Sequence, residues 1–311
     1  MSDREKFLKE KISSLVPKET ELESRGEHFD FHAPVTCSVT TSHSIAVGFG
    51  DGKVRFFFEG EKPSTIDAHN GVVLSIATNG EYIFTGGDDG RFLKLSQNGD
   101  IVEIANFNSR WVDSVAAYKD SMVCSSGRNV YIWSGDQKKA KSLEHSSTVG
   151  GLAFDYTGKR LAVSSYGGVT LWERGERRWT SKRLVWKGSH SKVGFSPDGK
   201  YIVTSMQESE LHGWRLRDKV DLAMRGYPAK IKSFAWVGDT PHLATSGDHQ
   251  AICWPFDGKD GPLGREPVCV ADCGKQISTF IEPLTGEKAI FVGFNDGSVL
   301  LSELDENKNP F

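Results

Sequence analysis

Short runs of β-branched and aromatic residues recur along almost the whole chain, separated by polar segments rich in Gly, Asn, Asp and Ser. Within many runs polar and apolar residues alternate, which indicates strands with one buried face. No long stretch of the chain after Pro17 carries the spacing of an amphipathic helix. The pattern therefore predicts an all-β protein built from many short strands.

A tight-turn signature returns about every forty residues, each time between two predicted strands. Glycine, Asn and Asp tolerate the positive φ that a two-residue hairpin turn requires. The turn sites are Gly50-Asp51-Gly52, Asp88-Asp89-Gly90, Gly127-Arg128-Asn129, Tyr166-Gly167-Gly168, Glu208-Ser209-Glu210, Asp248-His249-Gln250 and Asn295-Asp296-Gly297. One hairpin in each period of this length is typical of a propeller blade, so these seven sites predict a seven-bladed β-propeller.

Two further features repeat with the turns. The strand after the turn carries a Trp at one place in four of the periods, at Trp133, Trp172, Trp214 and Trp254. The loop that opens a period carries a His in three of them, at His69, His145 and His190. With the stretch Phe195-Ser196-Pro197-Asp198-Gly199-Lys200-Tyr201, these residues make the chain resemble the WD40-repeat family from about Phe29 onward. The resemblance implies the propeller fold and hydrogen bonds of each His within its own blade.

The N-terminal residues differ from the repeats. Residues 1–27 are predicted to be a short amphipathic helix followed by a polar linker, because apolar residues recur at helical spacing before Pro17. Residues 28–311 are predicted to be the propeller. Two roles stay open for the helix, packing on the propeller or binding a partner.

The last blade lacks sequence for its fourth strand, because few residues follow Leu304. The stretch His28-Phe29-Asp30-Phe31 alternates polar and apolar residues, as a half-buried strand does. Residues 28–33 are therefore predicted to close blade seven as its outermost strand, which would leave no unpaired join in the ring.

Composition narrows the class of partner. The chain has 38 Lys and Arg against 41 Asp and Glu, a formal net charge of −3, so no overall field favours nucleic acid or an anionic membrane. No apolar run approaches the roughly 18 residues that span a bilayer, and the charged start of the chain does not lead into a signal peptide. We expect a cytoplasmic monomer that binds neither membrane nor nucleic acid.

No catalytic or metal-binding motif stands out. The glycine-rich stretch Gly48–Gly52 lies between two strands and opens no helix that could hold a phosphate. Cys269 and Cys273, with His242, His249 or Cys253, could form a zinc site, but they lack the two tight ligand pairs that such sites show. We predict no enzyme activity, no cofactor and no metal, with zinc at this blade as the alternative.

The remaining candidate is a binding surface on the loops that lead into the innermost strands. One of these loops places a Trp beside an Arg, which is expected either to be exposed, as is typical of an interface hot spot, or to pack against a neighbouring loop. Nearby lysines would attract an acidic peptide. The candidate partner-binding residues are Arg110, Trp111, Lys192, Lys230, Lys232 and Lys275. The predicted function is a non-enzymatic scaffold that binds a partner protein or peptide. The alternative is a propeller that binds a ligand, an anion or a metal at its central channel.

Overall fold

The computed structural model describes residues 23–135, 137, 139–176, 178–238, 241–284 and 286–304. The chain separates into two units, residues up to Pro34 and residues from Val35 onward. In the described part of the first unit, a short 3-10 turn, η1 (Glu23–Arg25), is the only regular element. The amphipathic helix predicted before Pro17 lies outside the described residues.

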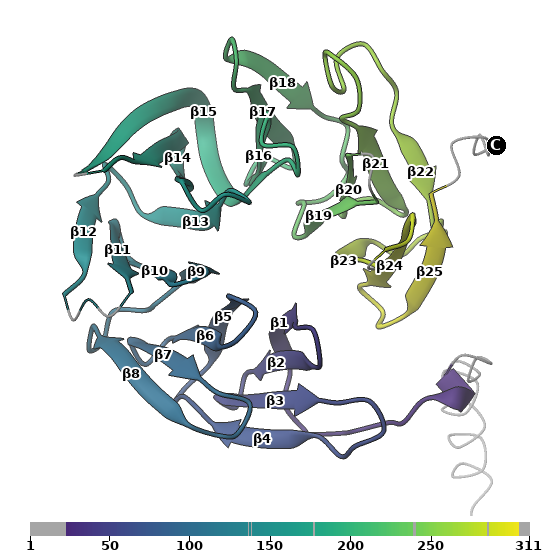
Figure 1. Cartoon of the computed structure of the whole chain (residues 1–311). Coiled ribbons are helices and arrows are strands. Elements are labelled where there is room, and N and C mark those ends of the chain that lie inside the picture. Colours follow the sequence, from purple (N-terminus) through teal and green to yellow (C-terminus); the bar gives the residue numbers. More distant parts are fainter. Residues whose placement is uncertain are drawn as a thin grey trace, which may run out of the picture. The chain divides into compact units, whose positions relative to one another are not determined.

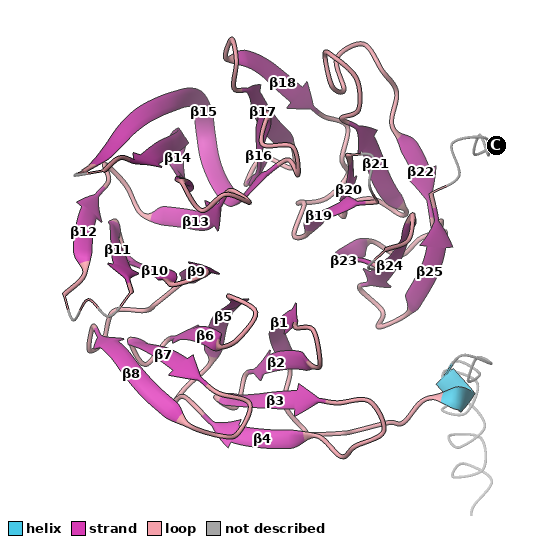
Figure 2. Cartoon of the chain, in the orientation of Figure 1, coloured by secondary structure: helices cyan, strands magenta, loops and turns pink. Residues whose placement is uncertain are grey.

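The second unit consists of antiparallel sheets whose strands follow one another in chain order, and Figures 1 and 2 show these sheets standing around a common centre. The first three sheets have four strands each. Their strands are β1 (Val35–Thr40), β2 (Ile45–Phe49), β3 (Lys53–Phe57) and β4 (Ser64–Asp67); β5 (Val73–Thr78), β6 (Ile83–Gly87), β7 (Arg91–Leu95) and β8 (Ile101–Asn106); β9 (Ser114–Tyr118), β10 (Ser121–Ser126), β11 (Asn129–Ser134) and β12 (Lys141–Glu144).

The other three sheets have six, four and three strands. Their strands are β13 (Val149–Phe154), β14 (Arg160–Arg174), β15 (Trp179–Phe195), β16 (Tyr201–Met206), β17 (Leu211–Arg215) and β18 (Val220–Met224); β19 (Phe234–Val237), β20 (His242–Thr245), β21 (Ala251–Pro255) and β22 (Val268–Val270); β23 (Ser278–Pro283), β24 (Ala289–Phe294) and β25 (Val299–Glu303). The described residues thus form an all-β propeller.

The six-stranded sheet explains why the structure shows six sheets where the sequence predicts seven blades. The first part of β15 pairs with β14, up to Ser189, and its last part pairs with β16 from His190 onward. A single long strand therefore joins two periods of the sequence repeat. The turn predicted at Tyr166 falls within β14, where Gly167 and Gly168 have φ values of 82° and 124°.

The last sheet has the three strands that the sequence predicts for blade seven. Residues 28–33 form no strand in this structure. Their pairing with the last sheet therefore remains a prediction.

The hydrophobic core lies between neighbouring sheets, not inside a single sheet. One cluster joins Val54 and Phe56 of the first sheet to Ile83 and Leu93 of the second. The second and third strands are consequently buried on both faces, as the uniformly buried β6 illustrates. The outer strands, such as β12, alternate between exposed and buried residues. The stacking of sheets thus holds the turns at their ends in fixed positions.

Candidate functional site

The loops that lead into the innermost strands and the turns between second and third strands lie on one face, which we call the loop face. It comprises residues 50–52, 68–72, 87–90, 107–113, 127–128, 145–148, 166–168, 187–192, 207–210, 226–233, 246–250, 271–277 and 295–298. Backbone hydrogen bonds tie these segments together. The N–H of Val112 donates to Gly87 O at 3.0 Å, and the N–H of Val149 donates to Gly127 O at 2.9 Å. These bonds connect the loops before β9 and β13 to the turn of the preceding sheet, so both loops are held in place before any partner binds.

Buried histidines form hydrogen bonds that connect segments of the loop face to neighbouring strands and turns. In the second sheet, Nδ1 of the buried His69 lies 2.9 Å from Asp89 Oδ1, and its Nε2 lies 2.9 Å from Thr85 Oγ1. Since the carboxylate can only accept, Nδ1 donates and Nε2 accepts the Thr85 proton. Burial lowers the pKa of His69 despite the nearby carboxylate. His69 is thus a neutral structural bridge between its loop and the turn.

The other two predicted histidines also bond within the protein. Trp172 Nε1 donates to His145 Nε2 at 3.1 Å. His190 donates from Nε2 to the Trp186 carbonyl at 3.3 Å, which leaves Nδ1 to accept from Thr204 at 2.8 Å. Burial lowers the pKa of both rings. These contacts agree with the structural role that the sequence predicts for the histidines.

Ser164 and Ser165 take no part in the hydrogen bond between Trp172 and His145. Ser164 Oγ donates to the Ser191 carbonyl, and Ser165 Oγ accepts from Arg183 at 3.1 Å. The hydroxyls instead connect the fourth period of the repeat to the long strand β15.

Trp111 is the most accessible Trp side chain on the loop face, with 58% of its surface exposed. It lies in the loop between β8 and β9, beside the exposed Arg110. The next residue, Val112, is fully buried and makes the hydrogen bond to Gly87. Because this neighbour anchors the backbone, Trp111 is held at the surface by the fold.

Two further apolar side chains are exposed in the adjacent sheet, and sequence reasoning missed both. Tyr166 is 66% exposed and Val185 is 70% exposed. Tyr166 belongs to the turn of β14, and its N–H donates to Ser147 Oγ at 3.1 Å. An aromatic residue in a turn position that usually takes Asn, Asp or Gly was the signal for it.

The four predicted lysines differ in whether their ammonium groups already have a partner within the protein. The Lys192 ammonium donates to the Phe234 carbonyl at 3.1 Å and lies 5.1 Å from the centroid of the Phe234 ring. Lys230 donates to Gln207 Oε1. The side chains of Lys232 and Lys275 are exposed and form no ion pair with another described residue. Lys192 and Lys230 therefore hold loops together, whereas the other two are available.

The structure does not gather these candidates into one patch. Arg110 and Trp111 precede β9, whereas Lys230 and Lys232 precede β19, on the other side of the central opening (Figure 1). Lys275 precedes β23. The loop face therefore has an aromatic side and a basic side. The two sides are separate because their residues belong to different blades. Sequence reasoning treated the aromatic and the basic residues as one site.

Carboxylates on the loop face reduce its positive charge. Arg225 Nε pairs with Glu210 at 2.7 Å, and Asp113 lies beside Val112 at the start of β9. Burial raises the pKa of Asp113. For Lys192 burial lowers the pKa of the ammonium group, and the charge of Glu282 only partly offsets this decrease. The face is mixed in charge, and its basic side is limited to a few lysines.

The cysteines proposed as an alternative zinc site do not converge with other ligands. No group of three or more His, Cys, Asp or Glu side chains that could hold a metal occurs among the described residues. Burial raises the pKa of Cys253 to about 12 and also raises that of Cys269. Cys273 Sγ instead lies 3.7 Å from Ser298 Oγ.

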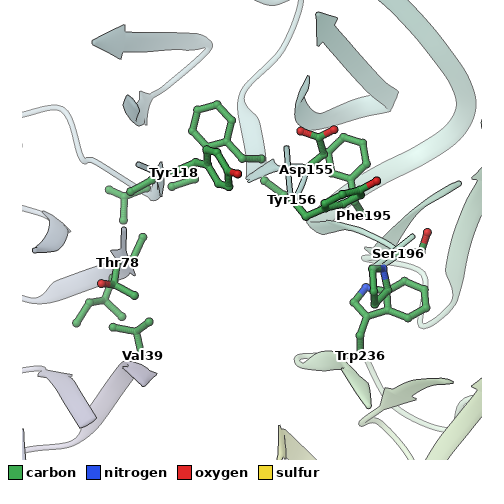
Figure 3. Close-up of a pocket in the computed structure, with 16 residues that line it drawn as sticks. Val39, Thr78, Tyr118, Asp155, Tyr156, Phe195, Ser196 and Trp236 are labelled. Carbon is green, nitrogen blue, oxygen red and sulfur yellow. The ribbon is translucent and has the colours of Figure 1, made fainter. Parts of the chain in front are cut away.

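A cavity of about 520 Å³ lies at the ends of the innermost strands opposite the loop face. Figure 3 shows Tyr118, Tyr156, Phe195 and Trp236 around it. Asp155, its one acidic group, is buried; burial alone would raise the pKa, but hydrogen bonds from Arg160 and Thr157 hold it below its ordinary value. The cavity is therefore apolar and aromatic, without a free acid or base.

Comparison with known proteins agrees with this geometry. The family profile described as "WD domain, G-beta repeat" matches residues 60–92, which include His69 and Asp89. A coronin-like protein of Saccharomyces cerevisiae (strain ATCC 204508 / S288c) is 27% identical over 187 residues, which cover 56% of this chain and 28% of that protein. The chain thus matches less than a third of the relative's length. Among the described residues, no helix is both long and apolar enough to cross a membrane. The matched repeat spans the same loop and turn that His69 and Asp89 join in the structure. We conclude that this chain is a β-propeller with a WD40 repeat at residues 60–92 and a distant similarity to a coronin-like protein.

Proposed function

We propose that the protein is a non-enzymatic scaffold that binds a partner protein on its loop face, with Trp111 as the principal anchor. The observation that carries the proposal is the exposure of this large aromatic side chain on a loop whose backbone is fixed by Val112 and Gly87. A rigid surface loses little conformational entropy when it binds. Trp is also the residue type most enriched among interface hot spots.

Tyr166 and Val185 extend the proposed contact surface to the neighbouring sheet, because both are more exposed than Trp111. On the basic side, Lys232 and Lys275 would steer an acidic segment of the partner. The partner is thus a folded protein or peptide that offers an apolar pocket and nearby carboxylates. We also propose that the protein acts in the cytoplasm as a monomer.

Two structural details belong to this proposal. The six-stranded sheet is counted as blades four and five, joined by β15, which gives the seven blades expected from the repeat. We further propose that residues 28–33, which form no strand in this structure, pair with the last sheet as its fourth strand. A closed ring would hold the loops at fixed spacing, which a scaffold needs.

The test is affinity purification of partners with the full chain, followed by measurement of binding to the partner so identified. We expect Trp111→Ala to weaken binding by about 2 kcal/mol, chiefly through faster dissociation. Val102→Ala is the matched control, because Val102 is an exposed apolar residue of the outer strand β8. Normal binding by the folded Trp111 variant would refute the role of this face.

A second candidate function is the binding of an apolar ligand in the channel, and the cavity of about 520 Å³ with its aromatic walls favours it. Such a volume falls in the range of roughly 300–1,000 Å³ that small-molecule sites occupy. A Tyr118→Ala variant that still binds the partner but loses binding of an aromatic probe would separate this function from the scaffold.

A further inference from the structure

A second concave site lies between the fifth and sixth periods of the repeat, at the strand ends opposite the loop face. We call it the basic pocket; its volume is about 290 Å³. It is lined by Gly199, Lys200, Tyr201, Arg215, Leu216, Arg217 and Lys259. Four of these seven residues are cations and none is acidic.

Two carboxylates outside the lining hold the guanidinium groups in place. Asp218 accepts from Nε and Nη2 of Arg215, both at 2.9 Å. Asp260 accepts from Nη1 of Arg215 and, at 3.2 Å, from Nη2 of Arg217. Arg215 is only 8% exposed, so its charge is fixed and partly desolvated. These pairs orient the two arginines before a ligand arrives.

The charges do not cancel. Lys200 pairs with Asp198 at 2.9 Å, whereas Lys259 forms no ion pair with a described residue. Four cations and the three carboxylates Asp198, Asp218 and Asp260 leave one net positive charge. All carboxylates lie outside the pocket lining, so an anion inside it would meet positive groups first.

Tyr201 adds an unused donor. Its side chain is 1% exposed, yet it lines the pocket, and its hydroxyl has no hydrogen-bond partner among the described residues. Since a tyrosine hydroxyl can donate one hydrogen bond, this group is available to an acceptor that enters the pocket. The hydroxyl therefore marks a position for a hydrogen-bond acceptor.

We propose that the basic pocket binds a phosphate monoester. Arginine and lysine donors recognise phosphate oxygens by charge-assisted hydrogen bonds, and the pocket offers both together with the Tyr201 hydroxyl. Lys259 and Arg217 contact the ligand, whereas Arg215 is a positioning residue because its donors are already engaged by Asp218 and Asp260. The site is independent of the loop face, so either proposal can fail alone.

The test is isothermal titration of the full chain in a phosphate-free buffer of low ionic strength. The probes are inorganic phosphate, ribose 5-phosphate and a short peptide with one phosphoserine. We expect saturable binding of all three probes. The ester with the higher affinity, ribose 5-phosphate or the phosphoserine peptide, indicates whether the natural ligand is a sugar phosphate or a phosphorylated protein segment. Absence of saturable binding for every probe would overturn the proposal.

Single substitutions test whether the phosphate probes bind in the basic pocket. We expect Lys259→Ala and Arg217→Ala each to weaken binding roughly tenfold, since both remove an exposed charge. Tyr201→Phe should weaken binding while the ring still fills the core. Lys288→Ala, which removes an equally exposed lysine outside the pocket, is the matched control and should leave affinity unchanged. Equal losses in Lys288→Ala and Lys259→Ala would contradict the assignment.

Discussion

The indole Nε1 of Trp254 donates a hydrogen bond of 2.7 Å to the hydroxyl of Tyr227. The Tyr227 hydroxyl donates a hydrogen bond of 2.7 Å to Thr245 Oγ1, and Thr245 in turn donates to the Ile252 carbonyl at 2.8 Å. The arrangement repeats that of Trp172 and His145, with Tyr227 in the place of the His. A buried tyrosine thus connects the loop before β19 to the second and third strands of its sheet.

We predict that Tyr227→Phe destabilises the protein by about 1–3 kcal/mol, because it leaves the Trp254 and Thr245 groups without their partner in a buried site. Urea unfolding followed by tryptophan fluorescence measures this. Tyr166→Phe is the control, since its ring is exposed, and should change stability by less than about 0.5 kcal/mol. Equal stability of both variants would show that the network does not contribute.

Stability should decrease in weak acid. The buried His212 stacks on Trp186, with ring centroids 3.9 Å apart, and burial lowers the pKa of His212 from 6.5 to about 4 although Asp221 accepts its Nε2 proton. The folded state therefore resists protonation that the unfolded state accepts. The free energy of unfolding is at its full value above pH 6.5 and falls as the pH is lowered to about 4.

For His212 the loss amounts to roughly 3 kcal/mol by the time the pH reaches about 4, since each unit of the pKa shift corresponds to about 1.4 kcal/mol. His212→Gln cannot titrate, so its stability should fall less between pH 7 and pH 4.5 than that of the natural chain. His69 and His145 titrate in both proteins and cancel in the comparison. Parallel pH profiles would contradict the assignment to His212.

Charge reversal of the exposed lysines should slow association with the partner. Lys232→Glu combined with Lys275→Glu is expected to reduce the association rate about tenfold at low salt, and the difference should shrink as salt is added. Stopped-flow mixing at several salt concentrations measures this. Lys288→Glu, a reversal outside the loop face, is the control. A salt-independent difference would argue against electrostatic steering.

Removal of residues 1–33 should destabilise the whole propeller, because the last sheet would lose the strand predicted to close it. Removal of residues 1–17 should leave the melting temperature unchanged. The two truncations are compared with the full chain by thermal unfolding. If the longer truncation melts with the full chain, residues 28–33 are not part of the ring.

Zinc is expected to be absent from protein purified without chelators, because the described residues contain no group of three or more His, Cys, Asp or Glu side chains that could hold a metal. Elemental analysis measures the metal content. Stoichiometric zinc that disappears in a Cys269→Ser, Cys273→Ser double variant would establish the alternative site.

The sequence by itself determined the class of fold and the positions of most strands. The turn residues impose a local backbone conformation, and the alternation of apolar residues imposes a buried face, so both can be recognised without knowing what packs against them. The turn at Asp88-Asp89-Gly90 lies between β6 and β7 as predicted, and the histidine loop at His69 lies against it. For Trp111 the sequence left exposure and packing against a neighbouring loop open, and the structure shows the side chain 58% exposed.

The tertiary structure decided what depends on contacts between distant residues. The joining of two periods by β15, the replacement of a His by Tyr227 and the separation of Trp111 from Lys230 all follow from how sheets pack around the ring. The basic pocket likewise unites Lys200, Arg217 and Lys259 from two periods of the repeat. Periodicity specifies each strand locally, but which loops meet is set by the packing of one sheet on the next, and no local pattern records that.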